Sequence, residues 1–428
     1  MQKGRLARSV SVIGAGYTPM GDVRSSPELL NFTEREMASL AFIEALEDAG
    51  IIAQDVEAYY LSISGPNYDT KMKSGAPFFA DWLGLRQKSA VFHDEGCGGQ
   101  VFGMEMAVNA VASGQYDCVV TLGIGINSSV PIPAYPPHIR KDQDNDTMWE
   151  SLYTGVEAGY EKPTYGGVGP MEAVLVRYAI QHNLSRDDID ETFVNYVLCK
   201  RKEALLNPKA LRITMTYEEE AKKHGFDDVR DYLFSKRYNP PMGTLIRSQY
   251  MGQTVDCASA VIICSTEKAM KLAKRPIEIA GIATMTSQGN AWSEVPLVPD
   301  MKMYKQAYEM AGITDPYHEI GYMGIHDCPA TSVIVAAEDA GYFRRGEAWR
   351  FMRDGRVSFD SDRPLTTTGG RTQAGHPRAP AFGVEVTEAI AQMRGENGAR
   401  QMPVPPKVSV IWGGGSSYST GTCVLRAL

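Results

Sequence analysis

Apolar residues in the first part of the chain alternate between short continuous runs and stretches of helical spacing. The segments RSVSVIGAGYT, VEAYYLSI and CVVTLGIG, at residues 8–18, 56–63 and 118–125, are typical of buried strands. Residues 34–50 and the segment from residue 101 repeat apolar positions three and four apart, as amphipathic helices do, and Gly50 is a predicted C-cap. Strands that alternate with helices predict an α/β protein with parallel or mixed sheets covered by helices.

The same order of elements returns in the last part of the chain. DCASAVIICS (256–265) is a predicted buried strand, and RPIEIAGIAT (275–284) resembles SVSVIGAGYT. A helix at 303–312, a strand before HDC, a glycine turn, a helix at 382–394 and a strand at 408–415 follow. This repeated order predicts an internal duplication, with one half at 1–125 and the other at 251–428.

Residues 126–250 have a different character, since they are rich in Tyr, Pro, Asn and charge. We interpret them as an inserted cap with helices at 170–182, after Ser185 and at 217–235. Basic residues in a cap usually form a solvated face. The alternative is a binding site for an anionic part of the substrate, such as coenzyme A. The candidate residues for binding it are Arg201, Lys209, Arg212 and Lys236.

Composition narrows the class of protein. Of the 428 residues, 43% are hydrophobic and 22% charged, as in globular proteins, and the net charge of −8 favours neither nucleic acid nor an anionic membrane as a partner. No apolar run reaches the roughly 18 residues that span a bilayer. The seven cysteines are scattered without a CxxC pair, which predicts a reduced, cytoplasmic protein without disulfides. The GAG at 14–16 lacks the third glycine of a dinucleotide fingerprint, because Pro19 stands there.

Cys97 occupies the most informative turn. Gly96, Gly98 and Gly99 flank it, a predicted strand ends at Phe92, and a predicted helix follows. A helix N-terminus lowers the pKa of a thiol, and glycines allow a ligand to approach the backbone closely. These are the conditions of a nucleophilic cysteine. A buried cysteine beside a glycine turn is the alternative that this stretch leaves open.

Two histidine motifs in the second half match that position. HDC (326–328) follows a predicted strand, and GHP (375–377) precedes a predicted helix. Taken alone, His376 could be a turn histidine and Cys328 a buried thiol. A zinc set of His326 and Cys328 with His93 or Cys97 fits no common ligand spacing, so we predict no metal.

The EGCGG turn, the HDC and GHP motifs, the GGG at 413–415 and the duplication together resemble the thiolase superfamily over nearly the whole chain. The HDC motif is similar to that of sterol-carrier-protein-type thiolases and of thiolase subunits that pair with a zinc-ribbon/OB-fold protein. The resemblance implies a five-layered α/β/α/β/α fold of two similar halves, with an inserted loop region that helps to bind coenzyme A.

It also implies roles for individual residues. Cys97 matches the acyl-accepting nucleophile, His376 the histidine that activates it, and His326 the residue that supports the oxyanion site. Cys328 matches the acid/base cysteine of the HDC subgroup. Backbone at Gly414 and Gly415 matches an oxyanion or substrate-binding segment.

Two departures from the family pattern bear on chemistry and substrate. Ile411-Trp412 stand where typical biosynthetic thiolases carry a proton-transfer cysteine, so that role falls to Cys328. The stretch after GHP is RAPAFG instead of LGATG or similar, which changes the expected acyl pocket.

The resemblance implies thiolytic cleavage of a 3-oxoacyl-CoA, or Claisen condensation, with coenzyme A as substrate and no cofactor. An aromatic substrate such as benzoylsuccinyl-CoA is one hypothesis. Acylation of a phenolic acceptor, retro-aldol cleavage on a thiolase fold and a non-catalytic scaffold subunit are alternatives. The expected partners are acyl-CoA, a second copy of the chain and a small zinc-ribbon/OB-fold subunit.

Overall fold

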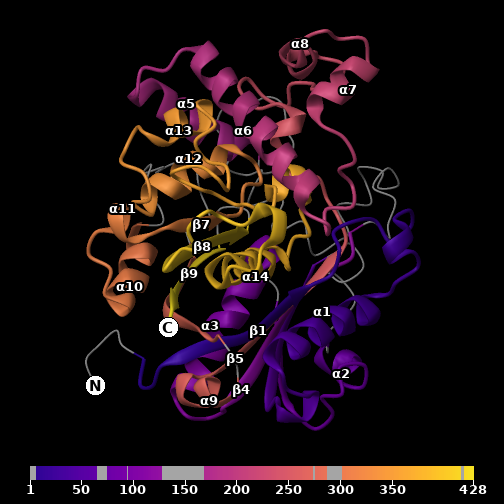
Figure 1. The fold of residues 1–428 in the computed structure, drawn as a ribbon, viewed down its shortest axis with the longest axis vertical. Coiled ribbons are helices and arrows are strands. Elements are labelled where there is room, and N and C mark those ends of the chain that lie inside the picture. The colour runs from indigo at the N-terminus through magenta and orange to yellow at the C-terminus, as the bar shows by residue number, and fades with distance from the viewer. Residues whose placement is uncertain are drawn as a thin grey trace.

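The computed structural model describes residues 6–64, 75–93, 95–127, 168–272, 275–286, 301–415 and 419–428 (Figure 1). Within these residues, the strands form one sheet in the order β3-β2-β4-β5-β1-β6-β9-β8-β7. Their bounds are β1 Val10–Tyr17, β2 Ala58–Ser64, β3 Ser89–His93, β4 Cys118–Gly125, β5 Cys257–Ser265, β6 Ile277–Thr286, β7 Tyr322–Ile325, β8 Val408–Gly415 and β9 Ser419–Ala427.

The sheet consists of two halves with matching connections. In the first, β2 and β4 are parallel, and β5 lies antiparallel between β4 and β1. In the second, β7 and β8 are parallel, and β9 lies antiparallel between β8 and β6. The halves join at β1 and β6 through the pairs Ser11–Glu278 and Val12–Ile277. The structure therefore contains the duplicated architecture of the predicted fold class.

The repeat in the sequence suggests that β5 belongs to the second half, but the structure places it in the first. The buried strand at 256–265 follows the cap in sequence, yet β5 lies in the first half of the sheet, between β4 and β1. The division of the chain at residues 125 and 250 remains a prediction.

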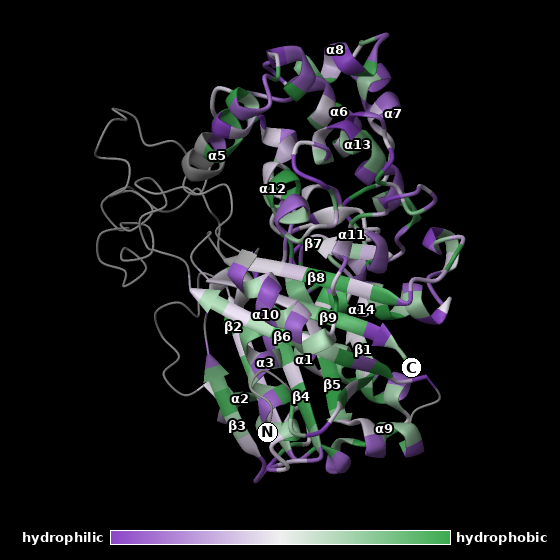
Figure 2. Ribbon diagram, turned by 90° about the vertical axis from the view of Figure 1, so that its left-hand side faces the viewer, coloured by the Kyte–Doolittle hydropathy of each residue, from purple (hydrophilic) through white to green (hydrophobic). Residues whose placement is uncertain are grey.

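Helices cover both faces of each half and fill the space between them (Figures 1 and 2). One apolar cluster joins α1 (Glu34–Ala49) to the outer face of the first half. A second contains side chains of α3 (Gly99–Ala112) and α14 (Ala381–Arg394) together with strands of both halves. A third joins α10 (Met301–Ala311) and α12 (Thr331–Asp339) to β7 and β8. This gives the predicted order of layers, helix, sheet, helix, sheet, helix.

The cap region contains α5 (Val168–Gln181), α6 (Arg186–Leu206), α7 (Tyr217–Lys223) and α8 (Val229–Phe234). The single helix predicted at 217–235 is wrong, because Gly225 takes a left-handed φ of 81° and the Asp228 side chain caps α8. The predicted cap residues 128–167 lie outside the described residues. The remaining helices are α2 (Gly75–Ala80), α9 (Thr266–Leu272), α11 (Pro316–Glu319) and α13 (Ala348–Arg353). Among the helices of the described ranges, none is long and apolar enough to cross a membrane.

Candidate active site

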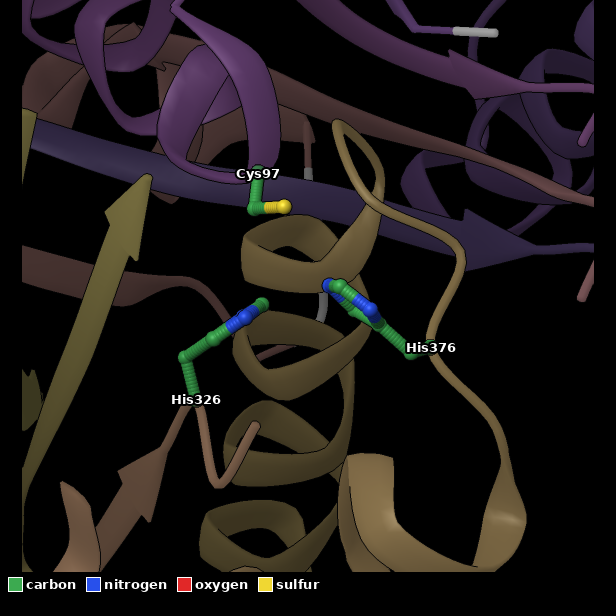
Figure 3. A group of neighbouring side chains, drawn as sticks. All are labelled: Cys97, His326 and His376. Carbon is green, nitrogen blue, oxygen red and sulfur yellow. The ribbon is translucent and has the colours of Figure 1, made fainter. Parts of the chain in front are cut away.

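Cys97, His326 and His376 meet between the two halves (Figure 3). Cys97 lies in a single helical turn, Gly96–Gly98, that precedes α3. His326 follows β7 directly, and His376 lies between a π-helical segment, Gly370–Ala374, and α14. The sulfur of Cys97 and one ring nitrogen of each histidine lie within 4.8 Å of one another.

Glycine allows the Cys97 turn to pack tightly against the first sheet. A Cβ added to Gly99 would stand 1.9 Å from the Ser62 Oγ atom on β2, so a larger residue would push the turn away. Gly96 takes a left-handed φ of 57°, which glycine adopts without strain. Cys97 is partly exposed and stands at the amino end of α3, where the helix dipole favours a thiolate.

Backbone hydrogen bonds hold both histidines. The His326 N–H donates to the Trp412 carbonyl on β8 at 3.1 Å, and Ser332 Oγ donates to the His326 carbonyl at 3.0 Å. The His376 N–H donates to the Gln253 carbonyl at 2.7 Å. The two imidazole rings cross at 75° with their centroids 4.8 Å apart.

Burial keeps both imidazoles neutral at ordinary pH. Desolvation, assisted by the charge of Arg371, lowers the pKa of His326 to about 3. Desolvation also lowers the pKa of His376 well below its usual value, with further contributions from His326, Arg378 and Arg371. Within the described part of the chain, His326 Nδ1 and His376 Nε2 are buried without a hydrogen-bond partner. A neutral imidazole can accept a proton from a thiol or donate one N–H to an oxyanion.

Cys328 adds a second thiol to the site. Its Sγ atom lies 3.4 Å from His376 Nδ1. Burial, followed by the proximity of Cys97, raises the pKa of Cys328 to about 12, so it holds its proton at neutral pH. Gly252 leaves room for this contact, because a Cβ there would lie 2.7 Å from Cys328 Sγ and 2.9 Å from His376 Cβ.

The sequence pattern did not identify Asp327 as the residue that holds the loop of His326 and Cys328 in place. The buried Asp327 carboxylate accepts hydrogen bonds from the Tyr196 hydroxyl at 2.8 Å, the Thr372 hydroxyl at 2.9 Å and the Arg371 N–H. It thus ties the loop of His326 and Cys328 to α6 and to the π-helical segment before His376. Burial raises the pKa of Asp327, and Arg371 opposes that change. The acid was visible inside the HDC motif, but nothing in the sequence pattern pointed to Tyr196.

The group Cys97, His326 and His376 also has ligand types that zinc accepts. It differs from the zinc set considered from the sequence, because neither Cys328 nor His93 belongs to it. His93 lies at the end of β3 with its Nε2 atom against Gly103. A metal at the three-residue group would occupy Cys97, the predicted nucleophile.

Gly414 and Gly415, whose backbone is predicted to bind an oxyanion or substrate, lie at the carboxyl end of β8. Gly414 pairs with Thr420 and Gly415 with Ser419 on β9. The same strand contacts the Cys97 turn, so this end of β8 lies at the site. The role of either backbone group in binding an oxyanion remains a prediction.

The four basic residues that were candidates for binding coenzyme A lie in different surroundings. Arg201 pairs with Glu220 and stands 4.2 Å above the ring of Tyr217. Lys209 pairs with Glu44 on α1, and Lys236 is exposed. Arg212 donates to the Thr254 carbonyl at 2.9 Å, and Thr254 forms a β-bridge with His376. Arg212 is therefore the one of the four that is connected directly to a segment of the site.

Comparisons with known proteins agree with this fold. Residues 281–427 match the family model described as "Thiolase C-terminal domain-like". The acetyl-CoA acetyltransferase of Methanothermobacter thermautotrophicus is 25% identical over 401 residues, which cover 92% of this chain and 93% of that protein.

Two solved structures share the fold. An Ltp2-ChsH2(DUF35) aldolase matches with a TM-score of 0.73 and 20% identity over 98% of both chains. Human mitochondrial 3-ketoacyl-CoA thiolase matches with a TM-score of 0.68 and 16% identity over 99% of both chains.

A duplicated α/β fold with the Cys97 turn between its halves is the fold of a thiolase-type enzyme. The predicted resemblance to the thiolase superfamily is confirmed, because the C-terminal third of the chain matches a thiolase family model and an acetyl-CoA acetyltransferase matches over 92% of the chain. Its relatives support an acyl-CoA acyltransferase.

Proposed function

We propose that this chain is a thiolase-type acyltransferase that cleaves a 3-oxoacyl-CoA with coenzyme A, or runs the reverse Claisen condensation, through an acyl-enzyme on Cys97. One observation carries the proposal. The Cys97 sulfur lies within 4.8 Å of nitrogens of two neutral, buried histidines, and a second protonated thiol contacts one of them.

In the cleavage direction, His376 takes the proton of Cys97, and the thiolate attacks the 3-oxo carbon. The bond between C2 and C3 breaks, and C3 remains on Cys97 as a thioester. The electron pair passes to C2 as an enolate, whose oxygen accepts an N–H of His326. Backbone at Gly414 and Gly415 is the proposed site for the oxygen on C3.

Cys328 then protonates C2 of the departing enolate, which leaves as the shortened acyl-CoA. His376 passes the proton that it took from Cys97 to the Cys328 thiolate, which lies 3.4 Å away. A coenzyme A thiol then enters, gives its proton to His376 and attacks the thioester. The acyl group leaves on coenzyme A, and the released Cys97 thiolate takes that proton back from His376. The helix N-terminus and the neutral imidazoles supply the nucleophile activation, and the Cys328 thiol supplies the carbon acid/base.

We further propose Arg212 as the first candidate for a contact with coenzyme A, because Thr254 connects it to His376. We also propose that the active form is a homodimer with an additional small zinc-ribbon/OB-fold subunit. The pairing with a DUF35 protein named for one structural relative supports that assembly. The aromatic acyl class, with benzoylsuccinyl-CoA as its example, belongs to the same proposal, as does a cytoplasmic location.

The test is the intact mass of the protein after incubation with acetoacetyl-CoA, using protein purified together with any co-expressed subunit. Wild type should gain one acetyl group, and Cys97→Ala should gain none. Cys199→Ala is the matched control, because Cys199 is a partly exposed cysteine on α6, outside the Cys97 group. It should be acylated like wild type.

Absence of a Cys97-dependent adduct would overturn the proposal. In that case the likeness to the aldolase structure makes retro-aldol cleavage, which needs no thioester on Cys97, the next candidate. Acylation of Cys97 with transfer to a phenol but not to coenzyme A would indicate the phenolic alternative. Zinc titration of the same samples tests whether a metal at Cys97 blocks the labelling.

A further inference from the structure

The segment after His376 carries an arginine in an unusual backbone conformation. Arg378 has a φ of 63°, in the left-handed region that glycine adopts freely and that residues with a Cβ avoid. Its surroundings hold it there, since the Ala379 N–H donates to Ser64 Oγ at 3.0 Å and the Ala381 N–H donates to the Arg378 carbonyl at 2.8 Å. A non-glycine residue kept in such a conformation at a site is a reason to seek a role for its side chain.

The backbone on both sides of Arg378 packs close to the Cys97 turn and the end of β4. The next residue, Ala379, packs against the Cys97 turn, with its Cβ 3.7 Å from a Cβ added to Gly99. The carbonyl of Pro377 packs on Gly125 at the end of β4. The charge of Arg378 contributes to the lowered pKa of His376, so the guanidinium is within electrostatic reach of that imidazole.

The positive charge of Arg378 has no counterion within the described ranges. Its side chain is partly buried and takes part in no ion pair or hydrogen bond there. The buried arginines nearby are different, because Arg371 pairs with Glu385 and Arg400 pairs with Glu388. A partly desolvated guanidinium without a carboxylate beside it suits an anionic ligand, which it can hold with two parallel hydrogen bonds.

Resting on the proposed acyl transfer at Cys97, we propose that Arg378 binds a carboxylate in the acyl part of the substrate. The substrate class is then a 3-oxoacyl-CoA that carries a free carboxylate close to the carbons that react. The arginine directly follows the GHP motif, so it places a cation next to His376 in the sequence.

The phosphates of coenzyme A are the other source of negative charge on such a substrate. The long pantetheine arm separates them from the thioester, whereas Arg378 is followed directly by Ala379, which packs on Gly99 beside the Cys97 turn. The acyl part is therefore the source that fits this position. The benzoylsuccinyl group belongs to this class, since a succinyl group bound to coenzyme A by one end has a free carboxylate at the other.

The test compares each carboxylate substrate with its methyl ester, which differs mainly in charge. The substrates are 3-oxoadipyl-CoA, benzoylsuccinyl-CoA and their methyl esters, and the readout is kcat/KM for thiolysis. Wild type should prefer at least one acid over its ester by about 10- to 100-fold, the size of one charge-assisted contact. Arg378→Met should remove that preference, and Arg378→Lys should keep part of it. Arg24→Met, which changes an exposed arginine paired with Asp22, is the matched control and should keep the wild-type ratio.

Equal turnover of acid and ester by wild type would overturn this inference, and so would the same ratio in Arg378→Met as in wild type. An equal loss of acid, ester and acetoacetyl-CoA turnover in Arg378→Met would do so too, since it would indicate a role in catalysis itself. With N-acetylcysteamine thioesters, which lack the phosphates, the preference for the acid should persist, and its disappearance would assign Arg378 to coenzyme A. Acylation of Cys97 by acetoacetyl-CoA, measured on the same samples, reports separately on the proposed function.

Discussion

The Sγ atom of Cys328 lies 3.4 Å from Nδ1 of His376, so the second thiol of this site contacts the imidazole that we propose activates Cys97. In the proposed mechanism, His376 thus stands between the nucleophile and the proton donor. Because burial raises the pKa of Cys328 to about 12, its resting form is the thiol, which can protonate a carbanion but is a poor nucleophile. The two cysteines should therefore have different and separable roles.

Replacement of Cys328 by Ala should separate those roles. We expect Cys97 to be acylated by acyl-CoA as in wild type, while condensation and thiolysis fall by about 10²- to 10⁴-fold, the usual contribution of general acid–base catalysis. Intact-mass measurement reports the first step, and the rate of C–C bond cleavage reports the second. If both steps fail equally in folded protein, the division of roles is wrong.

The depressed pKa of His326 predicts a pH dependence of stability. The unfolded chain binds a proton at His326 near pH 6.5, whereas the folded chain does so only near about pH 3. Unfolding therefore takes up a proton between these values, and the contribution of neutral His326 is complete above pH 6.5 and declines as the pH falls. The slope for one such group is at most about 1.4 kcal/mol per pH unit.

Urea unfolding of wild type and His326→Asn at pH 7.5 and pH 5 would isolate this effect from that of other buried groups. The free energy of unfolding of wild type should fall more on acidification than that of the variant. Parallel pH dependence of the two proteins would contradict the prediction.

Asp327 and Tyr196 should act as positioning residues. Tyr196→Phe removes one donor to a buried carboxylate, which should reduce stability by about 1–3 kcal/mol. We also expect kcat to fall while KM changes little, because the loop of His326 and Cys328 loses an anchor. Asp327→Asn, which keeps an acceptor, should be milder than Asp327→Ala.

Tyr178→Phe is the control for that experiment, because its hydroxyl donates to the buried Glu338 at 2.6 Å, on α12. It should lose comparable stability but keep the wild-type kcat. Equal effects of the two tyrosine variants on kcat would show that Tyr196 has only a structural role.

Gly252 should not tolerate a methyl group. Its added Cβ would meet Cys328 Sγ at 2.7 Å and His376 Cβ at 2.9 Å, so Gly252→Ala should displace one of the two groups and lower kcat. Gly114→Ala is the comparison. It places alanine at a φ of 84° with no atom within 4 Å, so we expect a stability loss of about 1 kcal/mol with normal activity. Activity of Gly252→Ala equal to that of Gly114→Ala would contradict the close packing at the site.

Much of the site could be predicted from local sequence. Cys97 stands among glycines between an apolar run and a helical repeat, and His326 and His376 stand at equivalent ends in the repeated half. These features depend on backbone propensity and on the period of apolar residues, which are properties of neighbouring positions. The strand at 118–125 was predicted with the bounds of β4, and the helix at 34–50 matches α1 with Gly50 as its cap.

The tertiary structure decided how these pieces meet. The contact of Cys328 with His376, the bond of Tyr196 to Asp327 and the place of β5 in the first sheet all join residues far apart in the chain. No local pattern encodes them, because they depend on how the two halves of the sheet pack around α3 and α14 and on how α6 packs against the π-helical segment. The same holds for Arg378: the sequence shows an arginine after GHP, but only the folded chain shows its left-handed backbone and its position beside His376.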